Sequence, residues 1–337
     1  MSDCGCSAID IHTHIVPENF PPYTSSTVNV AWPSMVPAQP CHRHVMLSGK
    51  VYRTVPETAW DTARRSADMD RLRVDRQVLS PMPELLSYWL GGADGAALTR
   101  YLNEQIAAMV AREPDRFFGL GAVPLQDVDR AIAELEHLMG ALGLAGVEIG
   151  TNIDGVVLGD RALDPFFAAA ERLGAAIFVH PLRPCGMERL VGPPLLQQVL
   201  AFPGETGLAA ASLLTSGTLE RHPQLRIAFS HGGGTLSTLL PRLRHAWNTF
   251  PALRDSVATD PLEAARRFWV DSLVYEDTAL RQLIERFGRT QVMVGSDYPF
   301  AIADADPVGR IEGLALDDET RHLLLSGNAL HWLGARG

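Results

Sequence analysis

Two histidines separated by one residue, His12 and His14, lie near the start of the chain and are candidate metal ligands. They follow the apolar run Ala8–Ile11 and precede Pro17. If the run is a strand, both imidazoles point to the same side of it, because side chains alternate along a strand. Imidazole nitrogens placed in this way are a natural pair of metal ligands. An isolated pair is more often exposed or hydrogen-bonded, so the rest of the chain must supply further ligands.

Three more candidate residues follow apolar runs of the same kind. His180 ends Ile-Phe-Val-His, His231 ends Ile-Ala-Phe-Ser-His, and Asp297 follows Val-Met-Val-Gly-Ser. One strand-end histidine would be read as a structural residue, but five such side chains on one face indicate a metal centre. We assign His12, His14, His180 and Asp297 to the metal, and His231 to proton transfer between bound water and substrate. Asp297 is the alternative acceptor for that proton.

This ligand set predicts that a metal-bound water molecule takes part in the chemistry. Three imidazoles and one carboxylate leave a position open for water on a divalent cation, with zinc expected and manganese as the alternative. The cation lowers the pKa of that water toward about 7, so hydroxide is available at neutral pH. We therefore expect an enzyme that uses a divalent metal ion.

The segments that must position these residues alternate between strand-like and helix-like patterns. Near-continuous apolar strands separated by amphipathic helices predict a parallel sheet covered by helices. Eight such strands predict a (β/α)8 TIM-type barrel, whose active site lies at the carboxyl ends of the strands. An open doubly wound sheet is the alternative, but no glycine-rich phosphate-binding fingerprint opens a first helix. The expected strands are Ala8–Ile11, Arg76–Ser80, Arg116–Val123, Ala145–Ile149, Ala176–His180, Leu225–His231, Phe268–Ser272 and Gln291–Asp297. Expected helices include Ala97–Ala111, Val128–Leu142, Pro165–Leu173 and Thr278–Phe287.

The first connection is much longer than the others. It covers about residues 17–63, is rich in proline, serine and histidine, and has no long helical period. A segment of this length within a compact domain is usually an active-site lid or a small inserted subdomain. Its end, Val45–Val55, alternates as a short hairpin does, and a second irregular stretch covers residues 181–203. We find no repeat or linker, so residues 1–337 are expected to form a single domain with this one insertion.

The overall composition excludes several classes of protein. A net charge of −10 argues against an extended nucleic-acid-binding surface. No apolar run approaches the roughly 20 residues that span a bilayer, and the N-terminus lacks a signal peptide pattern, so we expect a cytoplasmic protein without a membrane partner. The cysteines are expected to be reduced, and the alternative is a zinc site of poor spacing formed by Cys4, Cys6, Cys41 and His42. The cysteines are Cys4, Cys6, Cys41 and Cys185.

The sequence blocks around the candidate ligands make the chain similar to the amidohydrolase superfamily, and within it to the nonoxidative decarboxylases. These blocks are Asp10–His14, Pro124–Asp127, Val179–Pro181, Pro203–Thr206, Ser230–Gly234, Gly295–Phe300 and Asn328. The resemblance implies a metal-dependent decarboxylase of an unsaturated or aromatic carboxylic acid, such as 2-amino-3-carboxymuconate 6-semialdehyde or a close relative, from an aromatic or tryptophan-type degradation route. A metal-dependent hydrolase of a lactone or of a C–C bond is one alternative. A non-catalytic binding protein on a degenerate barrel is the other.

The same resemblance implies two arginines that bind substrate carboxylates. In similar proteins one comes from the long first loop and the other from the helix after strand six, supplied across a dimer interface. Arg53 and Arg242 fall at the matching positions. A planar guanidinium suits a carboxylate because two parallel hydrogen bonds fit it. We therefore expect a homodimer with a shared active site and a small carboxylate substrate.

Two further features follow from the resemblance. Binuclear members use a carbamylated lysine at the end of strand four, where this chain has Glu148, and its only lysine is Lys50, so one metal is expected. Glu148 is expected to be a buried, hydrogen-bonded acid, with a bridge to a second ion as the alternative. The chain departs from the family in pocket-forming loops, at Gln198 or its neighbours, where the family has tryptophan, and at Leu182 and Arg183. Arg183 either contacts another carboxylate or caps its loop.

Overall fold

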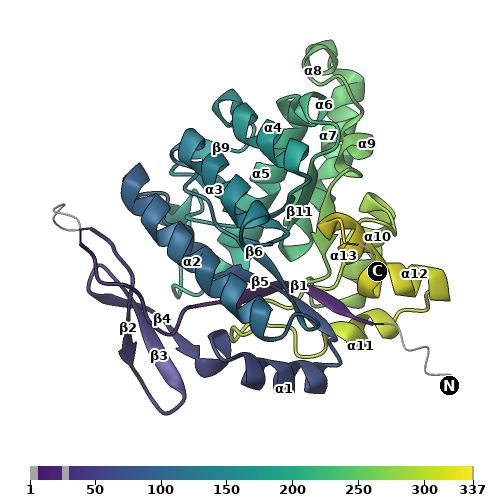
Figure 1. Ribbon diagram of the computed structural model, residues 1–337. Helices are drawn as coiled ribbons and strands as arrows, with labels where there is room; N and C mark the ends of the chain where they lie inside the picture. The colour runs from purple at the N-terminus through teal and green to yellow at the C-terminus, as the bar shows by residue number, and fades with distance from the viewer. Residues whose placement is uncertain (1–6, 25–29, 336–337) are drawn as a thin grey trace.

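Eight parallel strands form a closed barrel in the computed structural model, which describes residues 7–24 and 30–335. Figure 1 shows the barrel surrounded by helices. The sheet closes because the backbone N–H of Ile11 donates to the carbonyl of Val294, and that of Asp297 donates to the carbonyl of His12. The strands in barrel order are β1 (Ile9–Ile15), β5 (Arg76–Pro81), β6 (Phe117–Gly121), β7 (Gly146–Gly150), β10 (Ala176–His180), β11 (Arg226–Phe229), β12 (Trp269–Asp271) and β13 (Val292–Met293). The predicted (β/α)8 barrel is confirmed.

The barrel strands are buried on both faces, as their apolar sequences require. Every residue of β1 and of β10 is buried. β13 is the shortest barrel strand, because the chain leaves the ladder at Gly295 and reaches Asp297 in a left-handed conformation, with φ of 66°. The predicted strand over Gln291–Asp297 was therefore too long.

The four helices expected from their periodicity are present. They are α2 (Gly92–Arg112), α3 (Val128–Gly140), α4 (Asp164–Leu173) and α10 (Asp277–Phe287). The remaining helices are α1 (Thr62–Leu72), α5 (Phe202–Thr215), α6 (Thr218–Arg221), α7 (Leu236–Thr249), α8 (Pro251–Ser256), α9 (Pro261–Ala265), α11 (Pro307–Glu312), α12 (Asp318–His322) and α13 (Asn328–Leu333). The stretch over residues 181–203, irregular in sequence, contains a π-helical segment, Gln197–Ala201, that runs directly into α5.

The long first connection carries a three-stranded antiparallel sheet that projects from the barrel (Figure 1). It consists of β2 (Ser34–Pro37), β3 (His42–Leu47) and β4 (Lys50–Pro56). The turn between β3 and β4 is Ser48-Gly49, and both residues have positive φ, as a tight hairpin turn requires. The predicted hairpin is confirmed, while β2 was not predicted. Val45 and Val55 anchor this sheet to α2 through a small apolar cluster that includes Leu98 and Leu102.

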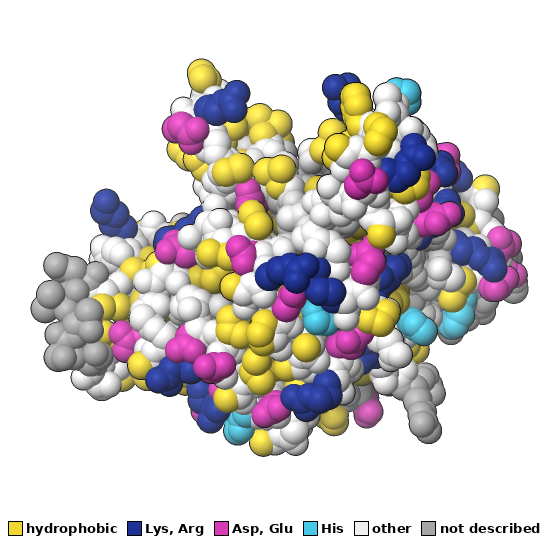
Figure 2. All heavy atoms as spheres, turned by 90° about the horizontal axis from the view of Figure 1, so that it is seen from above, with side chains coloured by type: hydrophobic (Ala, Val, Ile, Leu, Met, Phe, Trp, Pro, Cys, Tyr) yellow, Lys and Arg dark blue, Asp and Glu magenta, His cyan; other side chains and the backbone are white. Residues whose placement is uncertain are grey.

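The surface is mixed in charge. Figure 2 shows one face of the molecule, on which positive and negative side chains are interspersed rather than gathered into one large region of a single sign. Within the described residues, no helix combines the length and the apolar character needed to cross a bilayer. Cys41 and Cys185 are free thiols at the surface, whereas Cys4 and Cys6 lie outside the described residues.

Candidate metal centre and active-site cavity

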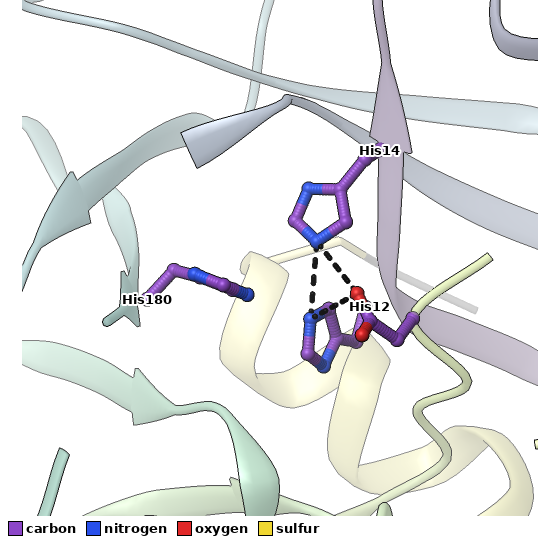
Figure 3. Close-up of side chains that lie close together, drawn as sticks. His12, His14 and His180 are labelled. Carbon is purple, nitrogen blue, oxygen red and sulfur yellow. Dashed lines mark hydrogen bonds and ion pairs between the residues drawn. The ribbon is translucent and has the colours of Figure 1, made fainter. Parts of the chain in front are cut away.

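Four side chains from three strand ends meet at one end of the barrel. The ligand atoms of His12, His14, His180 and Asp297 all lie within 4.8 Å of one another, and all four residues are buried. His12 and His14 leave β1 on the same side, and Figure 3 shows their imidazoles pointing toward that of His180. The structure thus brings together residues separated by up to 285 positions in the sequence, in the set predicted for a metal.

The histidine nitrogens that face the centre are those able to bind a cation. The Nδ1 of His12 donates to Asp271 at 2.7 Å, that of His14 to the carbonyl of Pro81 at 3.1 Å, and that of His180 to the carbonyl of Pro181 at 3.1 Å. Since these acceptors fix a proton on each Nδ1, each Nε2 presents its lone pair to the centre.

The atoms at the centre lack other partners. The Nε2 atoms of His12 and His14 are 3.2 Å apart, and Asp297 Oδ1 lies 3.1 Å from His14 Nε2. His180 Nε2 and Asp297 Oδ1 are buried without a hydrogen-bond partner among the described residues. Lone pairs crowded together in this way, with a carboxylate among them, fit a divalent cation, because burial without a partner is costly for each.

The electrostatic environment favours the metal-binding forms. Burial lowers the pKa of His14, and burial with the charges of neighbouring imidazoles lowers the pKa of His180 well below its ordinary value. Burial raises the pKa of Asp297, but the close contact of its carboxylate with His14 and the charges of the nearby histidines outweigh it, so the pKa is lowered. Burial also opposes a charge on His12, yet Asp271 and other carboxylates raise its pKa to about 9. A cation on Nε2 would take the place of that second proton.

Asp271, which sequence reasoning missed, organises the centre from the end of β12. Its carboxylate accepts from His12 Nδ1 and also from the backbone N–H groups of His231 at 2.9 Å and Gly232 at 2.7 Å. It therefore orients one metal ligand and places the proposed proton carrier with a single side chain. The signal was available in the sequence, because Asp271 ends an apolar strand just as His180 does.

A second network of buried hydrogen bonds fixes the backbone of β1. Asp10 accepts from the backbone N–H and the hydroxyl of Ser296, which ties β1 to the segment that carries Asp297. Arg65 of α1 is fully buried and donates to the backbone carbonyl of His14. These contacts fix the backbone of two ligand-bearing segments.

His231 lies beside the four ligands and faces the cavity. It follows β11 with a left-handed backbone, φ 54°, and its Nδ1 lies 3.2 Å from the hydroxyl of Ser230. Burial and the charge of His12 lower its pKa to about 4, so the imidazole is neutral. The position fits the proton-transfer role expected of it.

Glu148 lies deeper, at the fourth barrel strand. It is fully buried, and its Oε2 is 3.7 Å from His14 Nδ1. Burial raises its pKa to about 8, which favours the neutral acid. It is not among the described residues whose ligand atoms converge on the centre.

A cavity of about 320 Å³ opens from His180, His231 and Asp297 toward the loops. Its apolar wall includes Met82, Leu182, Phe202, Leu273, Val274, Phe300 and Ile302. Its polar wall includes Tyr52, Arg53, Glu84, Arg183, Gln197, Gln198 and Tyr275. The departures from the family noted at Gln198 and at Leu182 and Arg183 thus all line the cavity.

The structure separates the two arginines assigned to substrate. Arg53 of β4 lines the cavity, and its guanidinium lies over the ring of Phe300, 4.2 Å from the ring centre. Arg242 lies on the exposed face of α7 and does not line the cavity within this chain. A second copy of the chain would have to supply it, as the dimer prediction requires.

Comparison with known proteins agrees with this geometry. The amidohydrolase family model matches residues 9–335. A 2-amino-3-carboxymuconate-6-semialdehyde decarboxylase of Dictyostelium discoideum is 38% identical over 329 residues, covering 97% of this chain and 91% of the relative. The solved 5-carboxyvanillate decarboxylase of Novosphingobium aromaticivorans, in complex with manganese and 4-hydroxy-3-methoxy-5-nitrobenzoic acid, superposes with a TM-score of 0.74 at 25% identity over 82% of each chain.

The same fold occurs in a solved protein of lower sequence identity. Metarhizium anisopliae IDCase in its apo form matches 99% of this chain and 98% of its own with a TM-score of 0.83 at 21% identity. The family model alone spans nearly the whole described chain, and the expected resemblance is confirmed. The chain belongs to the amidohydrolase family.

Proposed function

We propose that this protein is a metal-dependent nonoxidative decarboxylase of an unsaturated or aromatic carboxylic acid, with 2-amino-3-carboxymuconate 6-semialdehyde or a close relative as substrate. The observation that carries the proposal is the convergence of three imidazole Nε2 atoms and one carboxylate oxygen beneath a cavity that contains an arginine. Relatives with decarboxylase names cover almost the full chain, which supports a carboxy-lyase that acts on a small acid.

His12, His14, His180 and Asp297 would hold one divalent ion, and zinc is our first choice. A solved decarboxylase similar to this chain contains manganese, which keeps that ion as the alternative. When bound, the ion would act as a Lewis acid and would lower the pKa of water at the centre.

The protein side chains would divide the remaining tasks. Arg53 and the partner-supplied Arg242 bind carboxylate groups and hold the substrate over the centre. The bond between the substrate carbon and its carboxyl group breaks, CO2 leaves, and the electron pair remains on that carbon. A proton then adds there, and His231 moves it, with Asp297 as the alternative carrier. The apolar wall limits the access of water to this step.

A homodimer with a shared site is part of the proposal. Beside the cavity, the turn before the π-helical segment, that segment itself, α5 and α7 expose several large apolar side chains. These are Leu195, Val199, Leu200, Leu208 and Leu239, between 47% and 68% exposed. Exposed apolar groups that gather in this way are typical of an interface. Arg242 lies on the same helix as Leu239, so a second copy packed there would carry its own Arg242 toward this region.

The test is product analysis with purified protein loaded with zinc or with manganese. We expect CO2 release from a semialdehyde or benzoate-type acid within a panel of such acids, with a product one carboxyl group smaller. Hydrolysis, detected as two fragments of which one carries oxygen from labelled water, would contradict the proposal. Absence of turnover together with absence of bound metal would favour a binding protein instead.

A further inference from the structure

A carboxylate that the proposed reaction does not use lies in the cavity wall. Glu84 belongs to the short helical turn Pro83–Leu86 after β5, and its side chain lines the same cavity as His231 and Arg53. Only 15% of that side chain is exposed. A carboxylate so far removed from water needs hydrogen-bond donors around it.

The protein supplies only some of the hydrogen-bond donors that the Glu84 carboxylate requires. The Nη2 of Arg183 lies 3.6 Å from Glu84 Oε1, an ion-pair distance that is long for a hydrogen bond. Arg183 is itself held in place by the ring of Trp89, against which its guanidinium stacks. Tyr52 and, at longer range, Arg53 are the other polar neighbours of Glu84. An ionised carboxylate has about four lone-pair positions, so acceptor capacity remains on the side that faces the cavity.

The charge balance agrees with this description. Burial raises the pKa of Glu84. The charges of Arg183 and Arg53 and the contact with Tyr52 lower it, but burial outweighs them. The carboxylate is therefore undercompensated, and an additional donor from a ligand would stabilise it. Arg53 has the opposite need. Its guanidinium lies by the rings of Tyr52 and Phe300 and is close enough for its charge to act on Glu84, but no carboxylate of the described residues forms an ion pair with it.

We propose that Glu84 accepts a hydrogen bond from an amino or hydroxyl group of the substrate, while Arg53 binds a carboxylate of the same molecule. This inference rests on the proposed function and narrows it to acids that carry a hydrogen-bond donor as well as a carboxylate remote from the metal. A site built to pair with a donor discriminates strongly against the analogue that lacks it, because the buried acceptor is then left unpaired. Arg183 and Trp89 position the acceptor.

Equilibrium binding tests this without any need for turnover. Isophthalate and its 2-, 4- and 5-amino and -hydroxy derivatives are titrated calorimetrically into the metal-loaded protein. We expect at least one derivative to bind about 10- to 100-fold more tightly than isophthalate. Glu84→Gln keeps the shape of the side chain and removes its charge, so it should lower this advantage at least about fivefold, and Glu84→Ala should abolish it. Isophthalate itself should bind both variants at least as tightly as the parent.

Glu188→Gln is the matched control, because Glu188 is an exposed acid in a nearby turn that does not line the cavity. It should leave every affinity unchanged. Binding of isophthalate without an advantage for any derivative, or an advantage that survives in both Glu84 variants, would overturn the role of Glu84 while leaving the proposed function intact. If no diacid binds at all, the carboxylate substrate class and this inference both fall.

Discussion

The metal end of the barrel and the outer wall of the cavity are built in opposite ways. At the metal end, every candidate ligand is buried, leaves a barrel strand or its continuation, and is oriented by a further hydrogen bond or ion contact. In the outer wall, Arg53 comes from the projecting sheet and Arg183 and Gln198 from a long connection, and all are partly exposed. Barrel strands fix the first region, and the long connections between barrel strands form the second.

This difference separates chemistry from selectivity. A buried group with a defined partner cannot change without a large loss, because the partner is left unsatisfied. A partly exposed side chain on a loop can change with a modest effect that depends on which ligand is bound. Substitutions at the metal end should therefore abolish activity toward every substrate, whereas substitutions in the wall should change the ranking of substrates.

The largest effect is expected for His180→Ala. It removes a ligand whose Nε2 has no partner among the described residues, so the protein should lose tightly bound metal and with it all measurable CO2 release. Metal content after dialysis is the measurement, and His245→Ala, at an exposed histidine of α7, is the control. If His180→Ala keeps its full metal content, His180 is not a metal ligand.

His231→Ala should separate the metal from the proton transfer. Because His231 is not among the four ligands, the variant should keep its metal, yet turnover should fall about 10²- to 10⁴-fold. Metal analysis and CO2 release are measured on the same preparation. Substantial residual turnover would assign the proton transfer to another group, with Asp297 as the first candidate.

Asp271→Asn tests whether the hydrogen bonds that Asp271 accepts contribute to metal affinity. The exchange weakens the acceptor for His12 and for two backbone N–H groups, so metal affinity should fall about 10- to 100-fold. Competition with a chelator measures it, and Asp277→Asn, an exposed acid of α10, is the control. If the two variants bind the metal with equal affinity, Asp271 does not contribute to metal binding.

The smallest effects should come from the arginines of the wall. Arg53→Ala and Arg242→Ala should each raise KM about 10- to 100-fold, since each loses a charge-assisted hydrogen bond to the substrate. If each site combines Arg53 of one chain with Arg242 of the other, mixing the two variants should restore about a quarter of the sites. Activity of the mixture equal to the mean of the two variants would exclude a shared site.

The same contrast explains what could be predicted from the sequence. A polar residue at the end of an apolar strand is a local signal, and in a barrel all such ends lie at one face, so the sequence alone suffices to place His12, His180 and Asp297 together. The pairing of Asp271 with His12 spans 259 positions and depends on how the barrel closes, which no local pattern records. Asp271 nevertheless has a local signal of its own, because it is an acid at the end of an apolar strand, and this signal makes it a candidate.

The outer wall was predicted less completely for a physical reason. Its residues come from segments without a regular period, so their neighbours depend on packing between loops. Glu84 gave no signal, because an acid in a turn is ordinarily exposed, and only the folded chain places it beside Arg183. Arg242 was selected by resemblance alone, and within one chain it lies away from the cavity.

The central claim is that one cation held by His12, His14, His180 and Asp297 is required for loss of CO2. The most direct measurement determines metal content and CO2 release in a single preparation, before chelation, after it, and after metal is restored. We predict one divalent ion per chain, loss of CO2 release as the ion is removed, and recovery in proportion to the metal taken up. CO2 release that persists in metal-free protein would contradict the account.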